Sequence, residues 1–191
     1  MTKIITNSQS QVCTFLEIRQ ILDDTYLFEK FLQKNALWVI MDPWYPTPYK
    51  KDVENCPNID QHNQKTIDKI LNYLPNLKLD HVCISCPKYL QDENENDILD
   101  FPVSVNPQLT NFYNIENDLI KLCKLMMKKS LSIIVYCGFH YGNCIVFKPD
   151  GVETTSRLFK TFVKKDLCCL FPNELTWEEA DNITKKYAEI I

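Results

Sequence analysis

The stretch SIIVYCGFHYGNCIV, residues 132–146, determines the fold that we expect for this chain. It opens with the short apolar run 133–136, which is typical of a buried parallel strand. Gly138 interrupts the run, and Cys144 follows where the first turn of a helix is expected. A side chain there points across the carboxyl edge of the sheet, where open α/β folds bind ligands. Cys144 is therefore the candidate nucleophile.

Two features of this stretch favour a reactive thiol. Aligned peptide dipoles at a helix N-terminus favour the thiolate, so we expect a lowered pKa for Cys144. The chain has only three glycines, and Gly138 and Gly142 flank the turn before Cys144. Glycine suits places where the backbone turns sharply or approaches a ligand closely. The alternative interpretation is that Cys144 is a small buried hydrophobic residue, as most free cysteines are.

The composition is that of one globular domain. The 191 residues are 45% hydrophobic and 24% charged, and the net charge of −4 gives no electrostatic reason to expect nucleic acid or an anionic membrane as partner. No apolar run approaches the length of a membrane span, and the N-terminus lacks a signal-peptide core. Nine cysteines without a secretory signal predict reduced thiols in a cytoplasmic compartment.

Strands that alternate with helices predict an α/β fold, a three-layer α/β/α sandwich with a mostly parallel, doubly wound sheet. Helical periodicity predicts an N-terminal helical segment within residues 1–35 that packs on the α/β domain 36–191. Strands are expected at 36–41, 81–85, 101–105, 133–136, 159–163 and 166–170. Helices are expected at 60–73, 115–126 and 144–157, and Thr176 with Glu179 forms a capping box for the last helix. The acidic run 91–97 is expected to be a solvated loop.

Asp42 stands directly at the end of the strand expected at 36–41 and opens a proline-rich loop. Neighbouring parallel strands end at the same edge of a sheet, so Asp42 and Cys144 are expected to lie close together. Trp44 and Tyr45 in this loop could line a pocket, cap a core or meet a partner chain. The alternative for Asp42 is a purely local role in the turn.

Taken together, these segments resemble the isochorismatase-like cysteine hydrolases, which include nicotinamidases and related amidases. The resemblance is carried by the strand WVIMDPW that ends in Asp42, and by YCGFHYGNCIV with its spacing from Gly138 to Cys144. It is also carried by the order of elements after the cysteine: a helix, the strand FKTFVKKDL and a closing helix. It covers residues 36–189, and the cysteine segment is its most specific part.

The resemblance implies a thiol that attacks an amide or related carbonyl and forms a thioester, which water then releases. By position, Asp42 would take the thiol proton, and backbone N–H groups near His140 and Cys144 would hold the oxyanion. It also implies a cis peptide bond at Phe139–His140. The turn residues implied in this role are Gly138, Phe139, His140 and Gly142. The alternative for His140 is a packed or hydrogen-bonded histidine.

The chain departs from the family pattern at two places. The segment NPQLTNF puts Asn106 where the family has a catalytic lysine, and residues 101–120 contain no lysine. Lys88 follows a neighbouring strand and could supply the missing cation; the alternative is an ordinary surface lysine. The segment that binds a metal in nicotinamidases is CISCPKY here, so we expect neither metal nor cofactor. We expect Trp44, Asn106 and Phe112 to line the pocket.

Cys83 and Cys86 form a C-x-x-C pair followed by Pro-Lys, which resembles a thioredoxin-type redox motif. The helix that should follow such a motif is replaced by the acidic run 91–97, which weakens this hypothesis. One such pair, even with the adjacent Cys168 and Cys169, provides too little for a zinc site.

Two functional hypotheses follow. The first is a diverged cysteine hydrolase of a small amide or related carbonyl substrate, using Cys144, Asp42 and Lys88. The second is a catalytically inactive protein that keeps the fold as a structural or interaction module, for example in a viral or other assembly. The missing lysine favours the second hypothesis, and the turn before Cys144 favours the first. The resemblance also implies a homo-oligomer or a component of a larger assembly.

Overall fold

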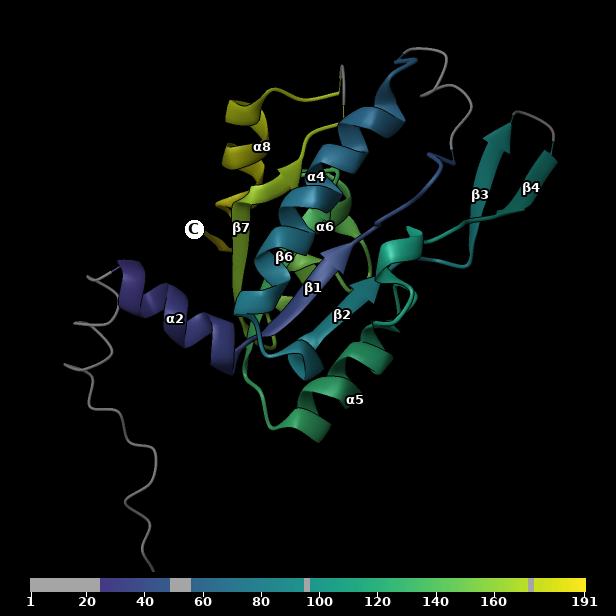
Figure 1. The fold of residues 1–191 in the computed structure, drawn as a ribbon. Coiled ribbons are helices and arrows are strands. Elements are labelled where there is room, and N and C mark those ends of the chain that lie inside the picture. The colour runs from purple at the N-terminus through teal and green to yellow at the C-terminus, as the bar shows by residue number, and fades with distance from the viewer. Residues whose placement is uncertain (1–24, 49–55, 95–96, 172–173) are drawn as a thin grey trace, which may run out of the picture.

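A computed structural model describes residues 25–48, 56–94, 97–171 and 174–191 (Figure 1). Six strands form one sheet in which every pair of neighbours is parallel, in the order β5-β2-β1-β6-β7-β8. These strands are β1 Leu37–Met41, β2 Val82–Ser85, β5 Tyr113–Asn114, β6 Ile133–Phe139, β7 Lys160–Cys169 and β8 Glu189–Ile190. The predicted α/β fold with a parallel sheet is confirmed.

Helices lie on both faces of the sheet. They are α2 Thr25–Asn35, α4 Ile59–Tyr73, α5 Leu119–Lys129, α6 Cys144–Phe147, α7 Val152–Thr155 and α8 Trp177–Thr184, with short 3-10 turns η1 Leu74–Asn76, η2 Leu79–His81 and η3 Pro107–Leu109. In Figure 1, α4 crosses the face toward the viewer and α6 lies behind it. All five residues of β1 are buried, as expected for a central strand covered on both faces. None of the helices in the described ranges has the length and apolarity needed to cross a membrane.

Local sequence signals explain where the later helices begin and end. The Asp118 side chain accepts hydrogen bonds from the first N–H groups of α5, and Ser130 closes that helix in the left-handed conformation. The capping box of Thr176 and Glu179 is present at the start of α8, so this prediction is confirmed. The N-terminal helical segment predicted within residues 1–35 is confirmed over α2, while its part before residue 25 lies outside the described residues.

The register between β1 and β6 places the two segments singled out in the sequence side by side. Met41 pairs with Gly138, so the two strands end together. Gly138 has a φ of +110°, and a Cβ there would lie 2.4 Å from the Met41 carbonyl oxygen. Only glycine fits this combination of positive φ and close backbone approach. Asp42, the first residue after β1, donates its N–H to the Ser85 carbonyl at 2.7 Å and therefore also contacts the end of β2.

Residues 89–102 differ from the prediction. Instead of a loop at 91–97 and a sheet strand at 101–105, the chain forms an antiparallel hairpin, β3 Tyr89–Asn94 and β4 Asp97–Pro102, which is a separate sheet. Figure 1 shows this hairpin projecting from the body of the molecule. A short turn closes an antiparallel pair at low entropic cost, whereas a parallel strand needs a crossover of about a dozen residues. The sheet therefore gains its edge strand only later, at β5.

The segment after Cys144 also differs from the prediction. The expected helix 144–157 is split into α6 and α7, because Pro149 cannot continue a helix and disfavours helical geometry in the residue before it. Lys148 accordingly has φ −61° and ψ 155°. The two strands expected at 159–163 and 166–170 are one strand, β7, whose register with β6 shifts between Tyr136 and Gly138. The break between α6 and α7 positions Lys148 for the site described below.

Candidate active site

Asp42, Cys144 and Lys148 meet where β1 and β6 end. The Lys148 Nζ lies 3.1 Å from Oδ2 and 3.3 Å from Oδ1 of Asp42. The Cys144 thiol lies close enough to the same carboxylate for the two groups to shift each other's pKa. The side chain of Asp42 is fully buried and that of Lys148 is 16% exposed, so the ion pair is shielded from water. The site thus joins a thiol, a carboxylate and an ammonium.

Burial and charge act in opposite directions on Asp42. Burial raises the pKa of its carboxyl group to about 6, although the Lys148 ammonium and the Cys144 thiol both act to lower it. A smaller rise comes from the negative charge of Asp150. Without Lys148, loss of hydration would act with little opposition. At neutral pH Asp42 is therefore mainly ionised, yet it can still accept a proton.

The predicted low pKa of Cys144 is wrong for the resting protein. Burial raises the pKa of this thiol well above its ordinary value, and the Asp42 carboxylate raises it further, while Lys148 lowers it. Helix α6 has only four residues, so its peptide dipoles add little against loss of hydration. Cys144 rests as a protonated thiol beside Asp42.

His140 contacts the thiol from the side of the turn. Its Nδ1 lies 3.1 Å from the Cys144 Sγ, and its ring packs edge-on against Trp44 and Phe171. Burial, and to a lesser extent Lys148, lowers the pKa of His140 to about 3. The imidazole is therefore neutral and holds a proton much less readily than Asp42, whose pKa is about 6. It orients the thiol but is a poor base.

Trp44 covers the ion pair, so the structure brings this predicted pocket residue to the site. Its side chain is 2% exposed, and the Lys148 Nζ lies 5.8 Å from the centre of its ring. The residue is held by a bridge to Val105. An aromatic face beside an ammonium is favourable and keeps water away from it.

The turn between β6 and α6 is built differently from what the resemblance implies. The Phe139–His140 peptide is not cis: among the described residues, the one cis bond is Tyr45–Pro46. Positive φ angles at Gly138, His140 and Gly142 reverse the chain instead. The N–H groups of Asn143 and Ile145 donate to the His140 carbonyl, whereas the Cys144 N–H has no backbone acceptor within the described ranges. That N–H is available to an oxyanion.

The structure does not bring Lys88 to this group. Its side chain is 67% exposed and pairs with Glu116, with 3.0 Å between the Lys88 Nζ and the Glu116 Oε1. The segment after β2 enters the projecting hairpin, which directs Lys88 to the surface. Lys148 is the cation beside Asp42, so the expectation of Lys88 in this position is wrong.

The other two predicted pocket residues lie elsewhere. Asn106 is buried and anchors the loop after Asp42: its N–H donates to the Pro43 carbonyl at 2.7 Å, and its side chain caps η3. Phe112 lines a separate cavity near Tyr113. Asn106 therefore holds the loop that follows Asp42 and does not line a pocket at the site, while Phe112 belongs to another surface.

Sequence reasoning missed Lys148, although a signal was present. Lys148 follows Cys144 by four residues, and residues at this spacing share one face of a helix. The helix expected at 144–157 already placed the two residues on one face, but the prediction did not connect Lys148 with Asp42. Pro149 ends α6 at this point and leaves Lys148 in an extended conformation beside Asp42.

A second buried carboxylate, Asp150, was also missed. The Ser85 hydroxyl donates to its Oδ2 at 2.5 Å, and the Tyr136 hydroxyl donates to its backbone carbonyl. Oδ1 has no hydrogen-bond partner from another residue in the described part of the chain. Burial raises the pKa of Asp150, while the bond from Ser85 and the charge of Lys148 lower it.

The redox and metal hypotheses gain no support. Cys83 and Cys86 are both buried free thiols, and burial raises the pKa of Cys86 to about 12 and that of Cys83 further. A thioredoxin-type motif needs the opposite shift at its first thiol. Within the described ranges, no three metal-ligating side chains lie together.

No protein-family model and no curated protein matches this sequence. Solved structures do match. An isochorismatase-like hydrolase from Alkaliphilus metalliredigens is 11% identical with a TM-score of 0.53, over 83% of this chain and 93% of that one. The YcaC gene product of Escherichia coli, an octameric hydrolase of unknown specificity, is 16% identical with a TM-score of 0.49, over 82% and 74%. N-carbamoylsarcosine amidase from Thermoplasma acidophilum is 12% identical with a TM-score of 0.48, over 82% and 95%. The likeness to the Alkaliphilus protein confirms the predicted resemblance at the level of the fold.

Proposed function

We propose that this protein, which has the fold of the isochorismatase-like hydrolases, is a cysteine hydrolase of a small amide or related carbonyl compound. The observation that carries the proposal is the buried Asp42–Lys148 ion pair in contact with the Cys144 thiol. The sequence placed Asp42 and Cys144 together but lacked the family lysine. Lys148 supplies a cation from a different part of the chain.

The first half of the reaction forms a thioester. The Cys144 thiol passes its proton to the Asp42 carboxylate as its sulfur attacks the carbonyl carbon of the substrate. The developing oxyanion accepts a hydrogen bond from the Cys144 N–H. When the intermediate collapses, the carbon–nitrogen bond breaks, and the proton on Asp42 goes to the departing amine.

The second half restores the enzyme. Water gives a proton to Asp42 while its oxygen attacks the thioester carbon, and the carbon–sulfur bond then breaks. The carboxylic acid product leaves, and the sulfur takes the proton back from Asp42. The same carboxylate thus acts as base and then as acid in each half, which suits a pKa of about 6.

Lys148 makes this cycle possible because it compensates negative charge in a dry site. At rest it balances the Asp42 carboxylate at 3.1 Å. When Asp42 takes the thiol proton, the negative charge moves to sulfur and then to the oxyanion, and the Lys148 ammonium balances it there. A cation close to a thiol lowers its pKa by about 1–3 units, which is a tenfold to thousandfold gain in thiolate.

The site admits only a small substrate. Cys144 is partly exposed, whereas Asp42 is fully buried and Trp44 and His140 are nearly so. The cavities of about 690, 500 and 320 Å³ are lined by other residues. A substrate must therefore present its carbonyl group at the edge of the turn, beside Cys144.

The test uses p-nitrophenyl acetate, an activated ester that acylates reactive thiols. We expect release of p-nitrophenol with an acetyl group trapped on Cys144, located by peptide mass spectrometry after acid quenching. Cys144→Ala should abolish both signals. Hydrolysis of a panel of small primary amides, followed by ammonia release, then defines the substrate class.

Cys123→Ala is the matched control, because Cys123 is also a partly exposed free thiol but lies in α5. This variant should keep the wild-type rate and the label on Cys144. Equal acetylation of Cys144 and Cys123, with a rate that Cys144→Ala leaves unchanged, would refute the proposal.

A second candidate is the catalytically inactive interaction module. It is favoured by the protonated resting state of Cys144 and by the tight packing of His140 against the ring of Phe171, with 4.3 Å between ring centres. This candidate predicts that Cys144→Ala and the wild type do not differ in any hydrolysis assay. It also predicts self-association or a partner chain, which analytical ultracentrifugation of the purified protein would measure.

A further inference from the structure

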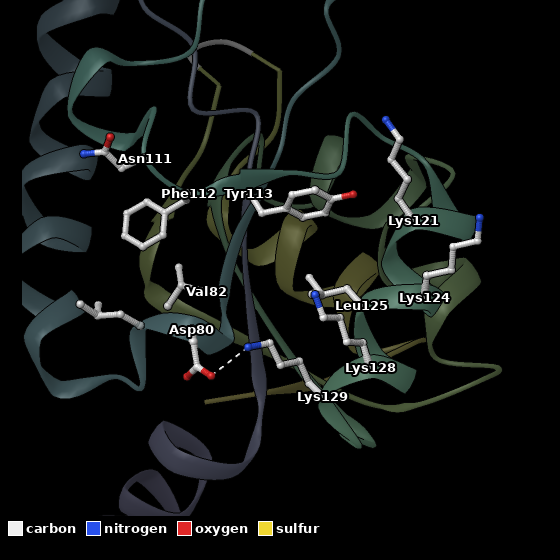
Figure 2. Close-up of a pocket in the computed structure, with 11 residues that line it drawn as sticks. Asp80, Val82, Asn111, Phe112, Tyr113, Lys121, Lys124, Leu125, Lys128 and Lys129 are labelled. Atoms are coloured by element: carbon white, nitrogen blue, oxygen red, sulfur yellow. Dashed lines mark hydrogen bonds and ion pairs between the residues drawn. The ribbon is translucent and has the colours of Figure 1, made fainter.

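A cavity of about 690 Å³ lies beside the edge strand β5, and Asp42, Cys144 and Lys148 do not line it. It is formed by η2, the end of the loop before β5, and one side of α5 (Figure 2). Its volume falls within the range of about 300–1,000 Å³ that is usual for small-molecule sites. Nothing in the proposed hydrolase chemistry uses this surface.

The floor of the cavity is apolar and partly aromatic. Val82, Phe112 and Leu125 line it, and in Figure 2 the ring of Tyr113 lies between Phe112 and the lysines of α5. Tyr113 is 54% exposed although it sits in the sheet. A half-exposed aromatic ring beside buried aliphatic groups provides a surface on which a flat apolar ligand can stack.

The rim of the cavity is positively charged. Helix α5 contributes four lysines and no acidic residue. Lys121 pairs with Glu116 and Lys129 pairs with Asp80, each with 2.8 Å between the charged atoms. The remaining two rim lysines are Lys124 and Lys128. In the described part of the chain, no carboxylate lies within ion-pair distance of Lys124 or Lys128.

Lys124 and Lys128 are one helical turn apart, so their side chains leave the same side of α5. Both line the cavity and both are exposed. Two unpaired ammonium groups at this spacing, on a chain whose net charge is −4, concentrate positive charge at one place. The acid group of a ligand would neutralise them while its apolar body covers the floor.

We propose that this cavity binds a small organic anion that combines a flat aromatic body with a phosphate or carboxylate group. The aromatic part lies on Phe112, Tyr113 and Leu125, and the acid group accepts hydrogen bonds from Lys124 and Lys128. Both acid groups form strong charge-assisted hydrogen bonds with lysine. The site is independent of Cys144, so binding does not require the hydrolase activity.

Isothermal titration of the full-length protein with four probes tests this proposal. Adenosine monophosphate carries an aromatic body with a phosphate, and 2-naphthoate an aromatic body with a carboxylate; adenosine and inorganic phosphate each carry one half of the feature. We expect one or both of the first two to bind, and each half alone to bind at least about tenfold more weakly. Which of the two binds identifies the acid group.

The variant Lys124→Gln/Lys128→Gln should weaken binding of the active probe about tenfold or more. Its control is Lys30→Gln/Lys34→Gln, which removes two exposed lysines at the same spacing from α2 and makes the same change in net charge. The control and Cys144→Ala should bind as the wild type does.

Three results would overturn the proposal: neither aromatic acid binds, adenosine binds as tightly as its monophosphate, or the α5 double variant binds unchanged. If that double variant instead lowers self-association in ultracentrifugation and leaves probe binding intact, the surface docks a second copy of the chain and not a small anion.

Discussion

Asp42 and Asp150 are two fully buried carboxylates near the same edge of the sheet, and they differ in their partners. Asp42 has the ammonium of Lys148 at 3.1 Å, whereas Asp150 has the hydroxyl of Ser85 at 2.5 Å. Burial raises the pKa of both groups. The comparison shows that burial raises the pKa of a carboxyl group whether its nearest partner is a cation or a hydroxyl, although Lys148 acts to lower both pKa values. What distinguishes Asp42 is its position: Lys148 opposes the rise in its pKa, and the Cys144 thiol lies beside it as a source of a proton.

Removing the cation tests this difference between Asp42 and Asp150, and it should have the largest effect that we expect. Lys148→Met should lower kcat/KM for p-nitrophenyl acetate about 10²–10³-fold, because no charge then opposes the oxyanion and the thiolate. The free energy of unfolding should fall by about 3–5 kcal/mol at neutral pH, since a buried charge has lost its partner. Steady-state kinetics and urea unfolding measure the two effects.

Two control variants accompany Lys148→Met. Lys88→Met removes an exposed lysine that pairs with Glu116, and its kinetics should match the wild type. Lys148→Arg keeps the positive charge, so it should retain most of the stability that Lys148→Met loses. If Lys88→Met lost activity while Lys148→Met kept it, the catalytic cation would be Lys88 and the role proposed for Lys148 would be refuted.

The second effect is the dependence of stability on pH that Asp42 contributes. Its pKa is raised from 3.8 to about 6, so between these values the native state binds more protons than the unfolded state. The free energy of unfolding must therefore fall as pH rises from about 4 to about 6, by about 3 kcal/mol in total. Asp42→Asn lacks this group. Urea unfolding of both proteins at pH 4 to 7 gives the difference between their free energies of unfolding, and the pH dependence of this difference is the contribution of Asp42. A difference that stays constant over this range would contradict the raised pKa.

The third effect is on rate. Asp42 must be ionised to accept the thiol proton, so the rate of Cys144 acetylation should rise about tenfold between pH 5 and 7 and level off above. The pKa of His140 at about 3 places its titration outside this range. Stopped-flow release of p-nitrophenol measures the profile. A rise centred near pH 9 would indicate direct ionisation of the thiol in place of transfer to Asp42.

The smallest effect concerns Asp150. Asp150→Asn keeps the shape and the acceptor for the Ser85 hydroxyl, so it should cost about 1 kcal/mol of stability and change kcat/KM less than threefold. The pH profile of acetylation should stay in place within a few tenths of a unit, because Asp150 is a minor influence on Asp42. A hundredfold loss of activity would mean that Asp150 takes part in the chemistry.

Much of the fold could be predicted because its signals are local. The apolar runs of β1, β2 and β6 mark buried strands, and Thr176 with Glu179 marks the start of α8. The hairpin β3–β4 was missed because its charged sequence resembles a solvated loop, and backbone pairing across a short turn does not require an apolar pattern. The long helix expected after Cys144 was wrong because Pro149 ends α6 and leaves Lys148 in an extended conformation.

The sequence by itself determined that the central strands run parallel and that Asp42 lies near Cys144. Both follow from the shared edge of parallel strands and from the glycine that lets β6 pass Met41 closely. The tertiary structure alone decided which lysine lies at the carboxylate, and whether the thiol pKa rises or falls. The identity of the lysine depends on the path of the chain after α6, and the direction of the pKa shift depends on how completely the neighbouring side chains exclude water from the thiol. Both are properties of the packed molecule as a whole.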